Sequence, residues 1–275
     1  MLDMHAPIAS LMTPDPLILD PDDGLDTAQD VMRATSSHEW PVARGRELLG
    51  MITMEDLMLS RQLDGLRARI SCGQLTNDAV FVAHPNDEII EAARKAQRHR
   101  LSCIPVAADH ELTGILTLTD LVKLAVDALK DERERFGSAP TVAHLMTPSP
   151  KSIRIYDCVA DAEVVMARFG IRHLPVLSDQ RVVGIISDRD IVGMLRTSTE
   201  PSSAILVGEI MTADPVTTTP EFTAETAGRL LLDKRIGALP VLRGGKLIGV
   251  ISKRDFLGYL VSLGPTLDLD RVWAD

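Results

Sequence analysis

One short pattern occurs four times along the chain at constant spacing, and it constrains the fold more than any other feature. An apolar residue, a proline and a valine stand at 40–42, 104–106, 174–176 and 239–241. A glycine follows each proline after nine residues, and an aspartate follows it after fifteen. Met-Thr precedes three copies, at residues 12, 146 and 211, whereas the second copy reads Leu75-Thr76-Asn77. Four copies in phase indicate four structural repeats.

The pattern of apolar residues predicts the same elements in each repeat. Ahead of the proline, apolar residues recur at helical spacing, as at Ala162, Val165, Met166 and Phe169. One strand carries Pro-Val, and a turn leads to a second strand that ends in Gly-apolar-apolar-Ser/Thr. A second helix is expected over 189–196 in the third repeat and 254–263 in the fourth. Each repeat therefore reads strand–helix–strand–strand–helix, and the fold class is α+β.

The spacing of the repeats divides the chain into two pairs. A unit of about 60 residues is near the lower limit for a self-sufficient core, so pairing is expected. The longest interval between successive motif prolines, from Pro105 to Pro175, contains the charged run 130–135 followed by Phe-Gly-Ser-Ala-Pro. This pattern indicates a helix that ends at a boundary between the two pairs. We predict a first pair over 1–135, with repeats at about 7–65 and 66–135, and a second pair over 136–275, with repeats at about 140–200 and 204–263 and a short C-terminal tail.

Composition excludes several classes of protein. A hydrophobic share of 45% with 25% charged residues is typical of a folded soluble chain. No apolar run approaches the ~18 residues of a membrane helix, and no signal peptide is visible. Three cysteines without a C-x-x-C disfavour disulfide frameworks and zinc ribbons. The net charge of −10 disfavours broad nucleic-acid binding. We expect a cytoplasmic protein that binds neither nucleic acid nor membranes.

The repeated motifs resemble those of the CBS domain, named for cystathionine β-synthase. Met-Thr, apolar-Pro-Val and Gly-apolar-apolar-Ser/Thr-x-x-Asp occur together four times, and the resemblance covers roughly residues 7–262. It implies tandem pairs with pseudo-twofold symmetry that assemble further into a disc-like dimer or a four-unit ring. It also implies a regulatory ligand that contains adenosine, such as AMP, ADP, ATP or S-adenosylmethionine. A homodimer and a regulated protein partner are expected as well.

The Ser/Thr-x-x-Asp motif at the start of the second helix has two interpretations. The hydroxyl and the carboxylate form a capping box, which is a purely structural role. The same helix end attracts phosphate, because free N–H groups and the helix dipole favour negative charge there. The resemblance implies that the aspartate accepts hydrogen bonds from ribose hydroxyls. Both roles are compatible.

Residues beside the motif favour the second pair as the binding site. Arg189, Lys253 and Arg254 stand at helix starts, where a guanidinium can form forked hydrogen bonds to phosphate. The alternative is a solvated helix face. In the first repeat Glu39 and Glu55 would repel phosphate, and Trp40 would fill the base pocket. Residues 1–139 carry 14 Lys and Arg against 23 Asp and Glu, whereas residues 140–275 carry 15 against 16.

By resemblance, two ligand sites are expected in the second pair, and residues of the two sites can mix because both repeats line each cleft. One site comprises Ile153, His173, Leu174, Pro175, Ser187, Arg189 and Asp190, and the other Thr217, Ala238, Leu239, Pro240, Ser252, Arg254 and Asp255. His173 would hydrogen-bond phosphate or, as we favour, simply lie at a strand rim. No catalytic motif and no metal-ligand spacing are present, so neither an enzyme nor a metal site is predicted. The competing hypothesis is a ligand-free module for oligomerisation and interaction.

Overall fold

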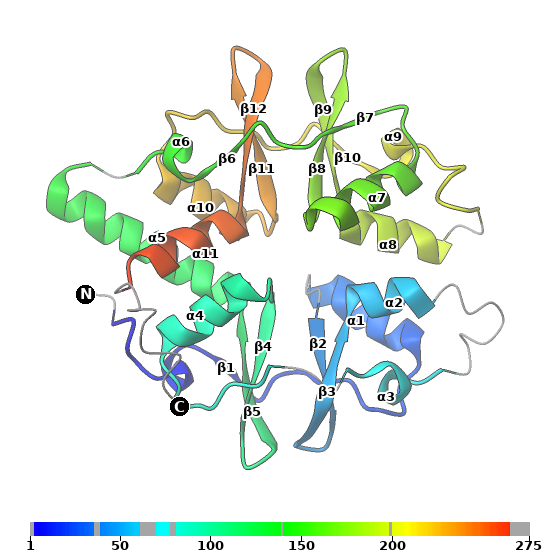
Figure 1. The fold of residues 1–275 in the computed structure, drawn as a ribbon, viewed down its shortest axis with the longest axis vertical. Coiled ribbons are helices and arrows are strands. Elements are labelled where there is room, and N and C mark those ends of the chain that lie inside the picture. Colours follow the sequence, from blue (N-terminus) through cyan, green and yellow to red (C-terminus); the bar gives the residue numbers. More distant parts are fainter. Residues whose placement is uncertain are drawn as a thin grey trace, which may run out of the picture.

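The computed structural model describes residues 3–35, 39–60, 70–77, 81–138, 140–197 and 200–264. They form four similar units, each a β-hairpin with helices, arranged as a flat ring (Figure 1). The hairpins point outward and most helices lie toward the middle. The first and second repeats occupy the lower half of Figure 1, and the third and fourth occupy the upper half. The first repeat faces the third, and the second faces the fourth.

The first pair contains the elements up to α5. The first repeat is built from η1 (Ile8–Ser10), β1 (Thr13–Pro14), α1 (Leu25–Thr35), β2 (Glu39–Arg44), β3 (Glu47–Thr53) and α2 (Met54–Leu59). The second is built from α3 (Cys72–Leu75), α4 (Ile89–Arg98), β4 (Cys103–Ala108), β5 (Glu111–Thr117) and α5 (Leu118–Phe136). Gly137 ends α5 with a φ of 71°, which confirms the helix end expected after the charged run.

The second pair repeats this order. The third repeat is built from α6 (Val142–Leu145), β6 (Thr147–Pro148), β7 (Ile153–Arg154), α7 (Val159–Phe169), β8 (His173–Ser178), β9 (Arg181–Ser187) and α8 (Asp188–Thr197). The fourth is built from α9 (Val207–Ile210), β10 (Thr212–Ala213), α10 (Ala224–Asp233), β11 (Ala238–Arg243), β12 (Lys246–Ser252) and α11 (Lys253–Ser262). The mixed α+β composition and the two second helices are as predicted. The C-terminal tail beyond residue 264 lies outside the described residues.

The Met-Thr segments cross between the two repeats of each pair. β1 pairs with β5 of the second repeat, β6 with β12 of the fourth, and β10 with β9 of the third. There each methionine packs on the motif glycine. A Cβ at Gly114 would lie 2.4 Å from Sδ of Met12, and a Cβ at Gly184 would lie 2.3 Å from Sδ of Met211. The methionine of one repeat therefore packs on the glycine of its partner repeat, and this contact joins the two repeats of a pair.

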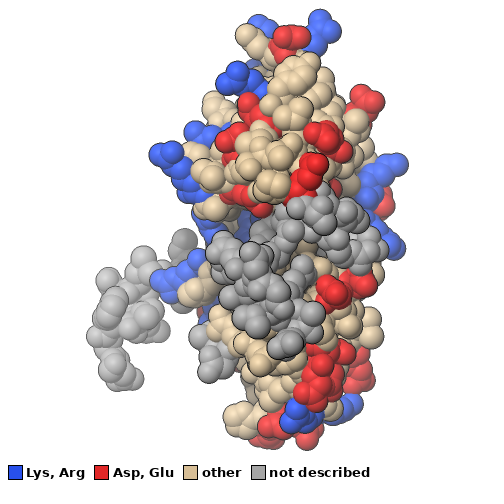
Figure 2. Space-filling model, turned by 90° about the vertical axis from the view of Figure 1, so that its right-hand side faces the viewer, with Lys and Arg blue, Asp and Glu red and all other residues tan. Residues whose placement is uncertain are grey.

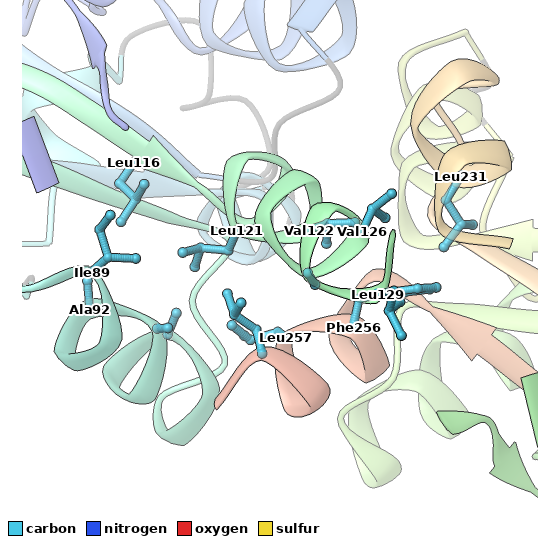
Figure 3. Close-up of a cluster of buried hydrophobic side chains, with 14 of the residues drawn as sticks. Ile89, Ala92, Leu116, Leu121, Val122, Val126, Leu129, Leu231, Phe256 and Leu257 are labelled. Carbon is cyan, nitrogen blue, oxygen red and sulfur yellow. The ribbon is translucent and has the colours of Figure 1, made fainter. Parts of the chain in front are cut away.

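The second and fourth repeats share one continuous apolar core, which we call the 2–4 seam. Helix α5 packs against α10 and α11, and the core includes buried Leu129, Leu231 and Phe256 (Figure 3). Two polar contacts flank it: Arg133 Nε lies 2.8 Å from Glu225 Oε2, and Tyr259 donates to Glu132 at 2.6 Å. The two pairs are thus joined by apolar burial on this side of the ring.

The first and third repeats meet at the 1–3 seam, which differs from the 2–4 seam in its apolar contacts. Among the described residues, the buried core of the first repeat takes one side chain from the third, Val192 of α8. On the side of the molecule formed by these repeats, Asp and Glu occur on both halves, whereas Lys and Arg gather mostly on the upper, second-pair half (Figure 2). This distribution matches the charge difference between the halves of the sequence. None of the described helices has the length and apolar composition to cross a bilayer.

Burial predicts which thiols react. Cys72 and Cys103 are buried, and burial, followed by nearby carboxylates, raises the pKa of Cys72 to about 11 and that of Cys103 well above its ordinary value. Cys158 is only partly buried. We expect one thiol per chain to react with a disulfide reagent at pH 8, and all three to react in denaturant. Cys158→Ser should abolish the native reaction, and two fast native thiols would contradict this prediction.

Candidate functional site: a cavity at the centre of the ring

A cavity of about 830 Å³ lies where the four repeats meet. One part, the first-pair lobe, is lined by Thr13, Asp15, Pro16, Leu17, Trp40, Ile115, Thr117 and Leu118. The other part, the second-pair lobe, is lined by Thr147, Ser149, Pro150, Lys151, His173, Gly237, Ala238, Val250, Ser252, Lys253, Arg254 and Asp255. Ser102, Thr119, Arg172 and Arg189 line the middle with residues 169–171. Its volume is that of an ordinary small-molecule site.

The crossing strands position the lobes. Thr13 pairs with Ile115 in the first lobe, and Thr147 pairs with Val250 in the second. Each lobe is therefore a cleft between the Met-Thr segment of one repeat and the Gly-containing strand of its partner. The threonine of the Met-Thr motif lines each lobe, at Thr13 and at Thr147. The motif could have indicated these positions, but only with the knowledge that its segment pairs with a strand of the partner repeat.

The motif aspartates form capping boxes in all four repeats, so the structural interpretation of Ser/Thr-x-x-Asp holds in every copy. In the fourth repeat the backbone N–H and the hydroxyl of Ser252 both donate to Asp255 Oδ2 at 2.7 Å. The equivalent bonds join Thr53 to Asp56, Thr117 to Asp120 and Ser187 to Asp190.

Asp255 is the motif aspartate that also lines the cavity. Its second oxygen, Oδ1, accepts a hydrogen bond from Thr147 at 3.1 Å. Burial raises the pKa of Asp255, and the bonds from Ser252 and Thr147 offset part of that shift. Asp255 therefore accepts the capping bonds through Oδ2, and the same residue lines the cavity.

Positive groups of the second pair converge on the cavity. Lys253 donates from Nζ to Oγ1 of Thr119 at 3.0 Å, and Arg254 donates to the carbonyl of Arg100, so both reach across to the second repeat. Burial and the charge of Arg189 lower the pKa of Lys253. Burial and the charge of Arg172 lower the pKa of Arg254 to about 10. Crowded, partly desolvated cations of this kind favour an anion between them.

Two cavity groups have buried polar atoms for which no hydrogen-bond partner is present among the described residues. They are Nε of Arg189 and Nε1 of Trp40. Buried donors in folded proteins are nearly always satisfied by protein, water or a ligand. Trp40 lies in the first-pair lobe, and Arg189 lies in the middle of the cavity.

The structure separates the predicted site residues into two groups. The cavity brings together His173, Arg189, Ala238, Ser252, Arg254 and Asp255. The others do not line it: Ile153, Leu174, Pro175, Ser187, Asp190, Thr217, Leu239 and Pro240. Leu174 and Leu239 are fully buried in the cores, and Thr217 is exposed. His173 begins β8 at the cavity rim.

The first-pair lobe was not predicted as part of the site. Sequence reasoning favoured the second pair as the better site, whereas Thr13, Trp40 and Thr117 extend the same cavity into the first pair. Arg172 in the middle was also missed, because it carries no motif. No cluster of His, Cys, Asp and Glu suited to a metal ion occurs within the described ranges.

The family model of the CBS domain matches residues 8–61, 72–127, 142–197 and 207–262, in phase with the four structural units. The chain belongs to the CBS domain family. Two pairs of CBS repeats thus form the ring, and the central cavity lies between them.

The chain is similar to curated proteins over very different shares of its length. The chain is 33% identical over 115 residues to an inosine-5'-monophosphate dehydrogenase of Korarchaeum cryptofilum, a match that covers 42% of this chain and 22% of that enzyme. It is 24% identical over 286 residues to an uncharacterized protein of Methanocaldococcus jannaschii, covering 94% of this chain and 63% of that protein. The chain therefore spans about a fifth of the first relative and under two thirds of the second.

Two solved structures share the whole ring fold. Protein MJ1225 from Methanocaldococcus jannaschii superposes with a TM-score of 0.79 at 19% identity, over 92% of this chain and 99% of that chain. An uncharacterized conserved protein from Pyrococcus horikoshii superposes with a TM-score of 0.63 at 22% identity over the same shares. At these identities the likeness establishes the four-CBS fold.

Proposed function

We propose that this CBS protein is a regulatory sensor that binds an adenosine nucleotide of the AMP, ADP or ATP class in the second-pair lobe. The observation that carries the proposal is that four cations line this lobe and the adjoining middle of the cavity together with the carboxylate of Asp255; they are Arg172, Arg189, Lys253 and Arg254. A ribose and a phosphate are the two groups that this arrangement suits. No catalytic activity is proposed.

Each part of a nucleotide has a counterpart in the lobe. The base would lie against the apolar surface of Pro150, Ala238 and Val250. The ribose hydroxyls would donate to Asp255. The phosphate would lie at the start of α11, where Arg254 offers a forked guanidinium and the helix dipole adds positive potential. S-adenosylmethionine fits this lobe less well, because its sulfonium would lie among like charges.

The same cations supply a regulatory mechanism. Lys253 and Arg254 hold Thr119 and the carbonyl of Arg100 in the opposite pair. A phosphate would compete for these donors, so its binding would favour a different packing of the two pairs. A ligand shifts such an equilibrium by its differential affinity for the two arrangements. A homodimer and a separate protein partner that reads this change are part of the proposal.

The competing function is a ligand-free module for oligomerisation and interaction. It is favoured by the capping boxes, which account for Ser/Thr-x-x-Asp in all four repeats without a ligand. Mass spectrometry of the purified protein after denaturation separates the two functions, since a sensor is expected to release bound nucleotide.

Thermal unfolding tests the proposal directly. Nucleotide at about 100 times its dissociation constant should stabilise the protein by about 2.7 kcal/mol, or about 5–10 °C. AMP, ADP and ATP are the ligands to compare, with S-adenosylmethionine as the cationic control and NADH as a larger adenosine ligand. Unchanged melting temperatures with every adenosine ligand would refute a nucleotide sensor and leave the interaction module.

A further inference from the structure

The two seams of the ring are held by different kinds of contact. The 2–4 seam has a shared apolar core, which includes Phe256. Across the 1–3 seam, an ion pair joins the first repeat to the third: Nη2 of Arg172 lies 3.5 Å from Oε1 of Glu39. A competing charge from solution can replace one member of an ion pair, whereas a shared apolar core offers no such exchange.

The repeat positions restrict this ion pair to one side of the ring. Counted from the motif prolines, Glu39 is equivalent to Cys103 in the second repeat, and Arg172 is equivalent to Gly237 in the fourth. The 2–4 side therefore carries a buried thiol and a glycine where the 1–3 side carries an acid and a guanidinium. The repeated fold alone does not account for the charged pair.

Glu39 is held in place as a buried anion by the second repeat. Only 7% of the residue is exposed, and it does not line the cavity. Its carboxylate accepts from the N–H groups of Ser102 and Cys103 at 3.2 Å and from the Ser102 hydroxyl at 3.3 Å. Because these bonds stabilise the charged form, Glu39 would remain a buried anion when Arg172 leaves it.

Arg172 connects this buried anion to the cavity. Its side chain is 29% exposed, and the residue lines the middle of the cavity. Arg172 also donates to the Ser102 hydroxyl, and its Nε lies 3.8 Å from Oδ2 of Asp188. A guanidinium has five donors in a fixed fork, so a change of its rotamer can exchange Glu39 for an anion in the cavity.

Two guanidinium groups repel each other beside this ion pair. Burial, and then the charge of Arg172, lowers the pKa of Arg254 to about 10, whereas the charge of Glu39 opposes this shift. Arg172 and Arg254 both line the cavity. An anion from solution between them would relieve the same repulsion that Glu39 relieves now. Glu39 and a soluble anion therefore act on the same cations.

We propose that Glu39 is an internal competitor of the anionic ligand and that its ion pair with Arg172 keeps the 1–3 seam closed. A phosphate in the cavity takes Arg172 from Glu39. The first and third repeats then separate, while the apolar core keeps the 2–4 seam closed and makes it the hinge. The inference rests on the proposed function, because the phosphate is that of the proposed nucleotide. The ligand shifts the ring toward the open form by its higher affinity for that form.

Calorimetry with AMP and with inorganic phosphate measures the competition. Glu39→Gln removes the internal charge and keeps an acceptor, so it should raise the affinity for either anion by at least about fivefold. Glu47→Gln is the matched control, because it removes an equal charge from an exposed position of the same repeat, and it should change either affinity by less than about twofold. In an Arg172→Gln background the effect of Glu39→Gln should also fall below about twofold, because no guanidinium is left to compete for.

Pulsed electron paramagnetic resonance measures the opening of the seam. Thr27→Cys on α1 and Ala167→Cys on α7 provide exposed sites for nitroxide labels on the 1–3 side. Gln97→Cys on α4 and Thr226→Cys on α10 provide them on the 2–4 side. Both pairs are made in a Cys158→Ser background, since Cys158 is the partly exposed native thiol. Saturating AMP or phosphate should lengthen the first distance by at least about 5 Å and change the second by less than about 2 Å.

The outcomes distinguish this inference from the proposed function. If AMP binds but the 1–3 distance stays unchanged, or if Glu39→Gln leaves the affinity unchanged, the inference is overturned and the nucleotide sensor stands. The same gain in affinity with and without Arg172 would also overturn it. Phosphate that opens the 1–3 seam without any AMP binding would support the inference and refute the nucleotide sensor, and no binding of either anion would refute both. The distance measurement keeps Glu39, so it decides even if Glu39→Gln does not fold.

Discussion

Asp255→Asn is expected to lower AMP affinity by about 10- to 100-fold, because hydrogen bonds to a charged acceptor are worth about 1.5–3 kcal/mol. Asp190→Asn is the matched control. Both aspartates accept the same pair of bonds from a serine three residues earlier, so both substitutions change these capping bonds, and Asp255→Asn also changes the bond from Thr147. Asp255 lines the cavity and Asp190 does not. Asp190→Asn should therefore change the affinity by less than about threefold.

Calorimetry over a pH series measures both the loss of affinity and its cause. Burial raises the pKa of Asp255 above its ordinary 3.8, and a protonated carboxyl no longer accepts both ribose hydroxyls. AMP affinity of the unsubstituted protein should fall as the pH falls through that raised pKa, and Asp255→Asn should lack this dependence. An equal loss of affinity in the two variants would assign the effect to the caps and refute ribose binding by Asp255.

Phe256→Ala is expected to destabilise the protein by about 3–5 kcal/mol, because it removes a fully buried aromatic ring and leaves a cavity. The ring lies in the core shared by the second and fourth repeats (Figure 3). Phe136→Ala is the control, since Phe136 ends α5 with 74% exposure and should change stability by less than about 0.5 kcal/mol.

Urea unfolding followed by circular dichroism measures this difference. The unsubstituted ring should unfold in one transition, because the 2–4 seam couples the pairs. In Phe256→Ala the coupling is weakened, so the two pairs should separate into two transitions. Equal stability of the two phenylalanine variants would show that the seam contributes little to holding the ring together.

The repeats, their pairing and the α+β class were predictable because their signals are local. The spacing of Pro, Gly and Asp fixes the hairpin and the second helix within some 60 residues of sequence. The packing of Met12 on Gly114 was not predictable from the motifs, although both residues belong to them. Their contact depends on which repeat receives the crossing segment, and that is decided by the pair as a whole.

The charged residues of the candidate site were easier to predict from the sequence than its apolar residues. Arg254 and Asp255 were selected by helix-end chemistry, and both line the cavity. Leu174 and Leu239 were selected by resemblance, but their side chains point into the cores. Trp40 stands at the same repeat position and reaches the cavity. The extension into the first pair arises from contacts between residues far apart in the sequence, which no local pattern reports.

The crossing of the Met-Thr segments also governs the order of folding during synthesis. Thr13 cannot take its place in a sheet until Ile115 has left the ribosome, so the first pair closes only after most of its residues have been made. The apolar face of α5 must then wait for Phe256 near the end of the described chain. Until that point the nascent protein presents an open apolar helix face, and transiently exposed faces of this kind are prone to aggregate.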